Sequence, residues 1–297
     1  MARPGVSPSA LPQRPLALRA LAFLRVVKPR ETALLAFIGW SAALVATDLR
    51  PPVGPFLLAA LAVLLGSAGA NGLTNVLDRH VDARMRRTRR RVLPAGLLTP
   101  LEAAVWSGAL VALALGIAWA LHPWAFMGGV VALAAALVAR KTWATHFLGA
   151  ISSCGPLWVG WLALRPEVTP LLGLLSLLVA LWVPVHVWML MLAYREDYRR
   201  AGVNIFPVDR GERVTVGLCL PLSVALLGVV GAIAWVGGFG PVFWVGSGAA
   251  GVALVGACGR TLLSPTAAHA FRAFRLTAFP FLGAVFLAMP LDRWVGG

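Results

Sequence analysis

Long apolar segments alternate with short polar ones along almost the whole chain of 297 residues. A helix crosses the roughly 30 Å hydrocarbon core of a bilayer with about 20 apolar residues. Segments near that length predict nine membrane-spanning helices, at residues 31–48, 54–76, 101–121, 124–139, 147–164, 169–193, 215–236, 241–258 and 276–291. The segments at 124–139 and 241–258 are rich in alanine and glycine, so the pattern allows eight to ten spans.

The composition excludes an ordinary water-soluble protein. Hydrophobic residues make up 59% of the chain and charged residues 12%, with a mean hydropathy of +0.82. A soluble chain is about 25% charged. Because lipid offers the backbone no hydrogen-bond partner outside a helix or a closed barrel, we expect an all-α membrane protein.

The net charge of +15 could indicate nucleic acid, but the distribution of the charges favours membrane orientation. With nine spans, 23 of the 26 basic residues fall on one side, and the exceptions are Arg50, Arg165 and Arg293. An excess of basic residues marks cytoplasmic segments. We therefore expect a multi-pass protein of the cell (inner) membrane with a cytoplasmic N-terminus and no nucleic-acid partner.

The N-terminal region differs from the rest. Residues 1–24 are predicted to form a basic cytoplasmic tail, and residues 25–297 the membrane domain. Arginines interrupt the apolar stretch that a signal peptide would need, and residues 16–27 read as an amphipathic helix in the membrane interface. Three cysteines without CxxC spacing are expected to be buried, inert thiols: Cys154, Cys219 and Cys258.

A first polar motif closes the second apolar segment. Helical spacing places Asn71, Asn75, Asp78 and Asp82 in one stripe, with neighbouring Cβ atoms about 5 to 6 Å apart. Two carboxylates that close repel each other unless a cation lies between them, and oxygen ligands suit Mg²⁺. The alternative is a helix end with two solvated acids paired to arginines. The asparagines within the membrane favour a functional site.

Seven arginines follow between residues 79 and 91. Guanidinium groups bind phosphate oxygens in forked pairs, so this run could hold a diphosphate, with Arg87 and Arg91 as the residues expected to reach it. The alternative is a topology signal that contacts anionic lipid.

A second motif lies at 194–208, after the sixth apolar segment. It contains Tyr194 and Tyr198, the only tyrosines of the chain, with Arg195 and Asp197 between them. Asp197 could hold a second Mg²⁺ opposite the first motif, and the tyrosines could donate hydrogen bonds to a diphosphate or face a developing cation. A pair of ordinary helix-end acids is the alternative.

Further candidates fall near the same membrane face. His186 lies about 12 Å below Tyr194 at 1.5 Å per residue, inside the bilayer, where a polar side chain is costly unless it faces the bundle interior. The basic candidates are Arg25, Lys28, Arg140 and Lys141, although basic residues at these positions are more often topology anchors than ligands.

Together these motifs resemble those of the UbiA superfamily of intramembrane prenyltransferases, and within it most closely the protoheme IX farnesyltransferases (haem O synthases). The similarity extends over about residues 25 to 292. The segments that carry it are Lys28-Pro29-Arg30, Asp78-Arg79-x-x-Asp82, Arg87-Thr88-Arg89-x-Arg91, Arg140-Lys141-Thr142, Trp182-x-Pro184-x-His186-x-Trp188, and Tyr194-x-x-Asp197-Tyr198-x-x-Ala201-Gly202.

The resemblance implies a helical bundle around a central cavity that opens to the cytoplasmic face. It implies farnesyl transfer from farnesyl diphosphate to the vinyl group of haem B, which gives haem O, with Mg²⁺ held by Asp78, Asp82 and Asp197. It implies that Tyr194 and Tyr198 act in catalysis, and it suggests association with a haem A synthase or a terminal oxidase assembly. The residues expected to bind substrate are Arg25, Lys28, Asn75, Arg87, Arg91, Arg140, Lys141, His186 and Arg195.

Some positions depart from the family pattern. Thr74 stands where the superfamily has asparagine, His80 replaces the acid between the two aspartates, and Asn204 and 205–206 differ from the haem branch. Both aspartates are intact, so the departures concern the acceptor more than the ionisation of the diphosphate. A UbiA-type transferase for an aromatic or quinone precursor is therefore the main alternative. A transporter is disfavoured, because its acids would lie near the bilayer midplane.

Overall fold

The computed structural model describes residues 15–138 and 142–296, and regular structure in this part of the chain is entirely helical. The helices are α1 (Leu16–Val26), α2 (Pro29–Ala46), α3 (Val53–Arg84), α4 (Pro100–Leu121), α5 (Pro123–Val138), α6 (Thr145–Leu162), α7 (Pro170–Ala193), α8 (Arg195–Arg200), α9 (Glu212–Gly237), α10 (Pro241–Leu263), α11 (Ala267–Leu276), η1 (Thr277–Gly283) and α12 (Ala284–Gly296).

Each predicted apolar segment falls on a helix. Among the described residues, six helices are long and apolar enough to cross a membrane: α3, α4, α7, α9, α10 and the continuous stretch Ala267–Gly296. The helices α2, α5 and α6 are not among them, so the predicted count of nine spans stays a prediction.

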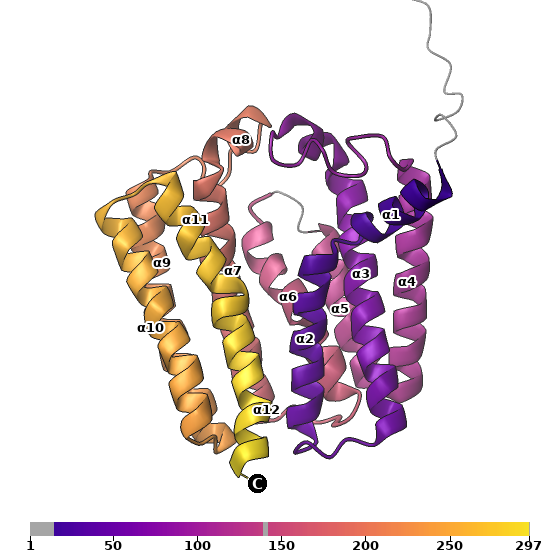
Figure 1. The fold of residues 1–297 in the computed structure, drawn as a ribbon, viewed down its shortest axis with the longest axis vertical. Coiled ribbons are helices and arrows are strands. Elements are labelled where there is room, and N and C mark those ends of the chain that lie inside the picture. Colours follow the sequence, from indigo (N-terminus) through magenta and orange to yellow (C-terminus); the bar gives the residue numbers. More distant parts are fainter. Residues whose placement is uncertain (1–14, 139–141, 297) are drawn as a thin grey trace, which may run out of the picture.

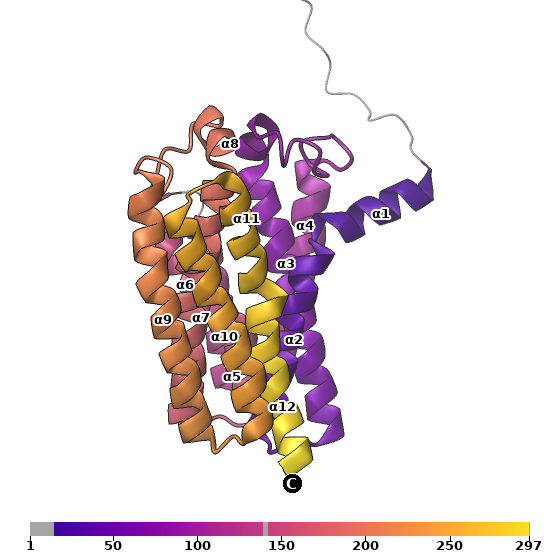
Figure 2. The same cartoon turned by 60° about the vertical axis from the view of Figure 1, so that its left-hand side comes forward.

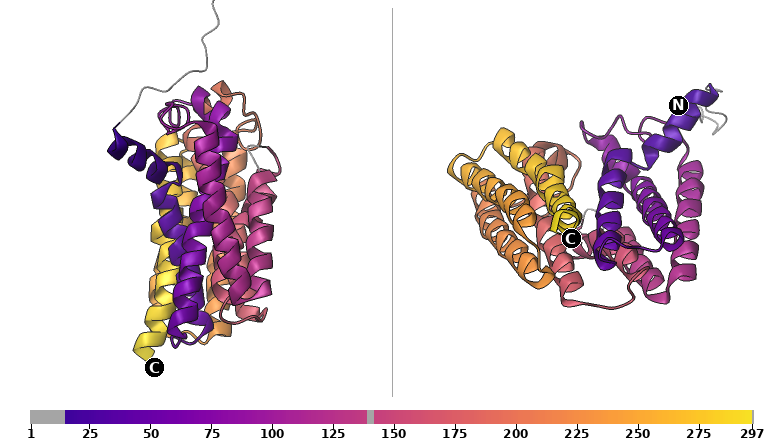
Figure 3. Two further views of the ribbon diagram at one scale, coloured as in Figure 1. Left: turned by 90° about the vertical axis from the view of Figure 1, so that its right-hand side faces the viewer. Right: turned by 60° about the horizontal axis from the view of Figure 1, so that its bottom comes forward.

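The long helices stand side by side in one bundle (Figures 1 and 2). The N-terminal half, α2 to α6, lies beside the C-terminal half, as the right-hand view of Figure 3 shows, and α2 packs against α12 across the two. One end of the bundle, called the loop end below, carries α1, residues 85–99 and α8 (Figure 1).

Local sequence explains where the helices begin. Thr99 accepts a hydrogen bond from the Glu102 backbone while the Glu102 carboxylate accepts one from the Thr99 backbone, which is a complete capping box before Pro100. The Thr169 hydroxyl caps α7 by accepting a hydrogen bond from the Leu172 backbone N–H, again before a proline at the first helical position. Proline suits this position because its missing N–H would have no partner there.

Two glycines allow α2 and α6 to cross closely. A Cβ atom at Gly160 would lie 2.1 Å from the carbonyl oxygen of Gly39, and one at Gly39 would lie 2.6 Å from the carbonyl oxygen of Pro156. No side chain fits there, and such small-residue contacts are how helices pack where lipid supplies no hydrophobic driving force.

The last predicted span is not one regular helix. The apolar segment predicted at 276–291 lies in a longer, bent helix. In this helix the π-helical segment η1 separates α11 from α12. Pro280 lacks an N–H and its ring crowds the preceding turn, and Ala278 leaves helical geometry with ψ of −119°. An apolar run alone does not show such a bend.

Two smaller predictions are confirmed. The segment predicted at 16–27 is the helix α1, which projects from the side of the bundle near the loop end, with Leu16, Leu21 and Leu24 exposed (Figure 2). The three cysteines are free and buried, as expected.

Candidate active site

The two aspartates of the first motif lie on the last turns of α3. This helix continues past the predicted apolar segment to Arg84, so both acids have the helical spacing that the sequence indicated. They are nevertheless buried, with 5% of Asp78 and 2% of Asp82 exposed. The loop that follows folds back over the helix end, where the Thr88 hydroxyl donates to the Asp82 carbonyl oxygen at 2.9 Å. Asp78 and Asp82 are therefore buried, in contrast to the solvated acids of the alternative interpretation.

Arg91 closes this loop against the helix. Its Nη1 lies 2.9 Å from Oδ2 of Asp82, and 31% of the Arg91 side chain is exposed. The predicted phosphate ligand Arg91 therefore stands directly beside a predicted metal ligand.

The second motif meets the first at the loop end. Oδ2 of Asp197, on α8, accepts a hydrogen bond from the Arg87 backbone N–H at 2.9 Å, across 110 positions of sequence. The Arg87 guanidinium lies over the ring of Tyr194, with 5.2 Å to its centroid. Like the other two acids, Asp197 is buried. This contact brings the second motif against the arginine run that follows the first motif.

Tyr198 faces the same charged groups. It is buried, with Met85 in the cluster around it. Burial raises the pKa of its phenol, and this effect is partly offset by Arg87 and Arg91. The phenol therefore stays protonated and able to donate a hydrogen bond.

Two buried polar atoms of the site have no hydrogen-bond partner within the described residues. One is Oδ1 of Asn75, whose Nδ2 donates to the Val26 carbonyl oxygen at 2.6 Å, and the other is Nε of Arg87. An unpaired buried polar group costs free energy, so such groups usually have a partner. The unpaired oxygen of Asn75 can bind a cation, and the unpaired N–H of Arg87 can bind an anion.

The described residues contain no group of three His, Cys, Asp or Glu side chains that could hold a metal ion by themselves, so the three predicted metal ligands do not form one closed cluster. The donors still fit Mg²⁺. This ion needs only one or two carboxylates with substrate phosphates and water, and Asn75, Asp78 and Asp82 offer oxygen atoms alone.

The predicted basic ligands have different places. Lys28, in a left-handed conformation between α1 and α2, donates from Nζ to the Thr74 hydroxyl at 3.3 Å and so lies one turn below Asp78. Arg25 is exposed on α1. Arg195 donates to the carbonyl oxygens of Val208 and Arg210, so it holds the loop after α8. Arg140 and Lys141 lie outside the described residues.

His186 occupies a separate polar position on α7. Its ring stacks on Trp182, with 4.5 Å between centroids, and contacts Phe274. Nδ1 lies 2.6 Å from the Thr277 hydroxyl, which donates its own hydrogen to the Phe274 carbonyl oxygen. The hydroxyl must therefore accept from Nδ1–H, and the lone pair of a neutral imidazole is left on Nε2.

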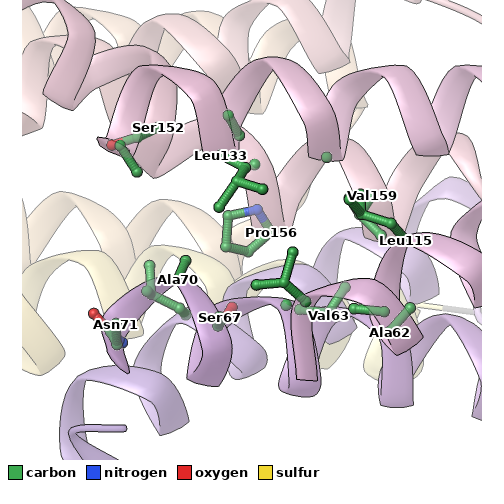
Figure 4. A pocket seen from close by; sticks show the side chains of 18 of the residues that line it. Ala62, Val63, Ser67, Ala70, Asn71, Leu115, Leu133, Ser152, Pro156 and Val159 are labelled. Atoms are coloured by element: carbon green, nitrogen blue, oxygen red, sulfur yellow. The ribbon is translucent and has the colours of Figure 1, made fainter. Parts of the chain in front are cut away.

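A cavity of about 240 Å³ runs between α2, α3, α4, α5 and α6, below the acids. Polar groups gather at one end, with Asn71 of α3 opposite Ser152 of α6, and apolar groups at the other (Figure 4). Lys28 and Thr74 also line it, so its polar end adjoins the last turns of α3. The resemblance implied a cavity, but its small lining residues, such as Gly66 and Ala114, gave no signal in the sequence. Thr277 was missed in the same way, because nothing in its surroundings marks it.

The profile of the UbiA prenyltransferase family matches residues 34–287, which is most of the chain. The chain belongs to this family. It is 34% identical over 285 residues to the protoheme IX farnesyltransferase of Desulforudis audaxviator (strain MP104C), covering 93% of this chain and 89% of the relative. It is 34% identical over 278 residues to the protoheme IX farnesyltransferase of Symbiobacterium thermophilum, covering 91% and 93%.

The fold is similar to that of a UbiA homolog from Archaeoglobus fulgidus bound to GPP and Mg²⁺, with a TM-score of 0.63, 16% identity, and coverage of 90% of this chain and 99% of that one. This likeness shows the fold alone. With the family and the apolar helices, the chain is a multi-pass membrane prenyltransferase.

Proposed function

We propose that the protein transfers the farnesyl group of farnesyl diphosphate to a vinyl group of haem B, in a Mg²⁺-dependent reaction that gives haem O. The observation that carries the proposal is the meeting of the buried acids of α3 with Arg87, Arg91 and Asp197 at the loop end. Haem as the acceptor is supported by the relatives, which are named protoheme IX farnesyltransferases.

In this proposal the site holds the leaving diphosphate. Asp78 and Asp82, with Oδ1 of Asn75, would hold Mg²⁺, which supplies charge stabilisation for the departing phosphate oxygens. The unpaired Nε of Arg87 donates to the diphosphate, and the neutral phenol of Tyr198 is a further donor. Donors aimed at developing negative charge lower the barrier to breaking the allylic C–O bond.

The farnesyl chain then lies in the cavity that helices α2 to α6 line. Its polar end, at Lys28 and Thr74, adjoins the diphosphate site, and its other end is apolar. An allylic cation needs shelter from water, and a cavity inside a lipid-embedded bundle provides it. The vinyl carbon forms a bond to C1 of the farnesyl group as diphosphate leaves. Water then adds to the haem-side cation and loses a proton, which gives a hydroxyethylfarnesyl group.

His186 is proposed to seat the acceptor on the opposite half of the bundle. Trp182 and Phe274 fix the plane of its ring, and the Thr277 hydroxyl fixes its tautomer with the lone pair on Nε2. A histidine that donates one ring N–H to a fixed acceptor can offer the other nitrogen to a haem iron or to a hydrogen-bond donor.

The remaining predictions belong to the same proposal. The bundle has nine spans in the inner membrane, its N-terminus is cytoplasmic, and the loop end faces the cytoplasm, where Arg140 and Lys141 would add positive charge. Association with a haem A synthase or a terminal oxidase assembly stays a prediction, which copurification from native membranes tests.

The test uses purified enzyme with farnesyl diphosphate and haem B, with products identified by mass. Asp78→Ala and Asp82→Ala should each abolish turnover. Glu196→Gln changes an exposed acid beside Asp197 that pairs with Arg200, and it should preserve turnover. Unaltered turnover in either aspartate variant would rule out the metal role. A prenylated product from a hydroxybenzoate, with none from haem B, would show that the protein is a prenyltransferase with a different acceptor.

A further inference from the structure

The length of the cavity lined by helices α2 to α6 follows from helix geometry. Its lining on α3 runs from Thr74 at the polar end through Gly66 to Ala62 at the apolar end. At 1.5 Å per residue, Gly66 lies about 12 Å and Ala62 about 18 Å below Thr74.

Prenyl chains of successive lengths differ by steps that this scale resolves. With carbon–carbon bonds of about 1.5 Å and tetrahedral angles, an extended main chain gains about 1.3 Å per bond. A geranyl chain is then about 9 Å long, a farnesyl chain about 14 Å and a geranylgeranyl chain about 19 Å. A chain that starts beside Thr74 passes Gly66 only from farnesyl upward, and reaches the apolar end only as geranylgeranyl.

The apolar end is closed by side chains of two further helices. A Cβ atom at Gly129 would lie 3.0 Å from Cδ2 of Leu115 and 3.4 Å from Cγ2 of Val159, so these three residues converge. Figure 4 shows Leu115 and Val159 beside Ala62 at this end. Leu115 contributes the largest side chain there that a substitution can shorten.

Gly66 lines the cavity on α3 between its polar and apolar ends. A Cβ atom at Gly66 would meet only the Cβ of Ala114, at 3.5 Å, which is an ordinary contact. A longer side chain would therefore enter the cavity instead of separating the two helices. Gly69, by contrast, would meet the Ser107 carbonyl oxygen at 2.6 Å, so that glycine serves helix packing.

We infer that this cavity selects the length of the prenyl chain. Gly66 leaves room for a farnesyl group, and Leu115 excludes chains longer than farnesyl. The inference rests on the proposed function, since it takes the prenyl diphosphate as substrate. It adds which residues decide the chain length.

The experiment compares geranyl, farnesyl and geranylgeranyl diphosphates in the purified full-length enzyme with haem B. Gly66→Leu should lower the ratio of farnesyl to geranyl transfer by at least about tenfold, because steric exclusion by a few methylene groups has that size. Leu115→Ala should raise the ratio of geranylgeranyl to farnesyl transfer by about tenfold. Retained transfer of geranyl by Gly66→Leu shows that the variant is folded.

A matched control lies next to the closing residue. Gly116 is on the same helix as Leu115, and a Cβ atom there would meet nothing within 4 Å, so Gly116→Leu adds the same bulk outside the cavity. It should leave both ratios within twofold of the wild type. Unchanged ratios in Gly66→Leu or in Leu115→Ala, or an equal shift in Gly116→Leu, would overturn the inference.

Thermal stabilisation of the same variants by each diphosphate, without acceptor, reads the cavity independently of catalysis. Gly66→Leu should lose stabilisation by farnesyl diphosphate relative to geranyl diphosphate. If the wild type makes no prenylated haem but the stabilisation by the three diphosphates changes in the variants as expected, the proposed acceptor is wrong and the inference stands. If haem is farnesylated and these stabilisations are the same in the variants as in the wild type, only the inference is wrong.

Discussion

Removal of the Arg91 charge tests how the buried acid of α3 is held. Arg91 lies 2.9 Å from Asp82, which is 2% exposed, so Arg91→Gln removes a cationic partner of a buried carboxylate. Two unit charges about 4 Å apart attract by about 4 kcal/mol at an effective dielectric constant of 20. Because Arg91 is 31% exposed, solvent screening reduces this gross value, and we expect a coupling free energy of about 1 to 3 kcal/mol.

The double variant separates stability from catalysis. Asp82→Asn in the Arg91→Gln background removes the buried negative charge that has lost its Arg91 partner, so the double variant should be more stable than Arg91→Gln alone. At roughly 2 to 4 °C per kcal/mol for a chain of this size, the difference in apparent unfolding temperature should be about 2 to 12 °C at one scan rate in detergent. The double variant should not turn over farnesyl diphosphate, because the side chain at position 82 no longer carries the negative charge proposed to bind Mg²⁺.

The control is Arg90→Gln, an exposed neighbour in the same loop, which should change neither quantity. Equal unfolding temperatures for Arg91→Gln and the double variant would show that the pair is not coupled. Recovery of wild-type turnover in the double variant would refute the role of the Asp82 carboxylate.

Two further predictions concern the hydrogen-bond donors of the site. Burial raises the pKa of Tyr198, so the phenol is neutral below its unfolded pKa of about 10 and its contribution is lost only as the pH rises through the higher folded value. Tyr198→Phe should therefore lower kcat/KM for farnesyl diphosphate about tenfold, and this factor should be the same at every pH from 6 to 9. A factor that varies over this range would contradict the argument. Thr277→Val removes the acceptor for Nδ1–H of His186 and should raise KM for haem B roughly three- to tenfold with KM for farnesyl diphosphate unchanged, whereas an equal rise in both would indicate a general packing defect.

Much of the site was predictable because its chemistry is concentrated in two short motifs. Helical spacing alone places Asp78 and Asp82 on one face of α3, and charge asymmetry assigns the motifs to one side of the membrane. That the two motifs meet was a hypothesis from the acids that both carry on one predicted membrane face, since spacing carries no information about residues 110 positions apart. The contact between Arg87 and Asp197 supplies it.

Arginine roles were less predictable. Arg91 reaches Asp82, whereas Arg195 spends its donors on the carbonyl oxygens of its own loop. Both occur in arginine-rich segments beside an acid, so composition does not distinguish them. Loop conformation decides which guanidinium faces the site.

The sequence by itself determined the class of the protein, its helical segments and the polar residues at their ends, because apolar length and charge are local properties of the chain. Only the tertiary structure decided the bend at Pro280, the partner of His186 and the cavity past Gly66 to Leu115. The physical reason is that a membrane helix is apolar on every side. Its sequence therefore does not mark which small residues face the interior, and helix packing settles this.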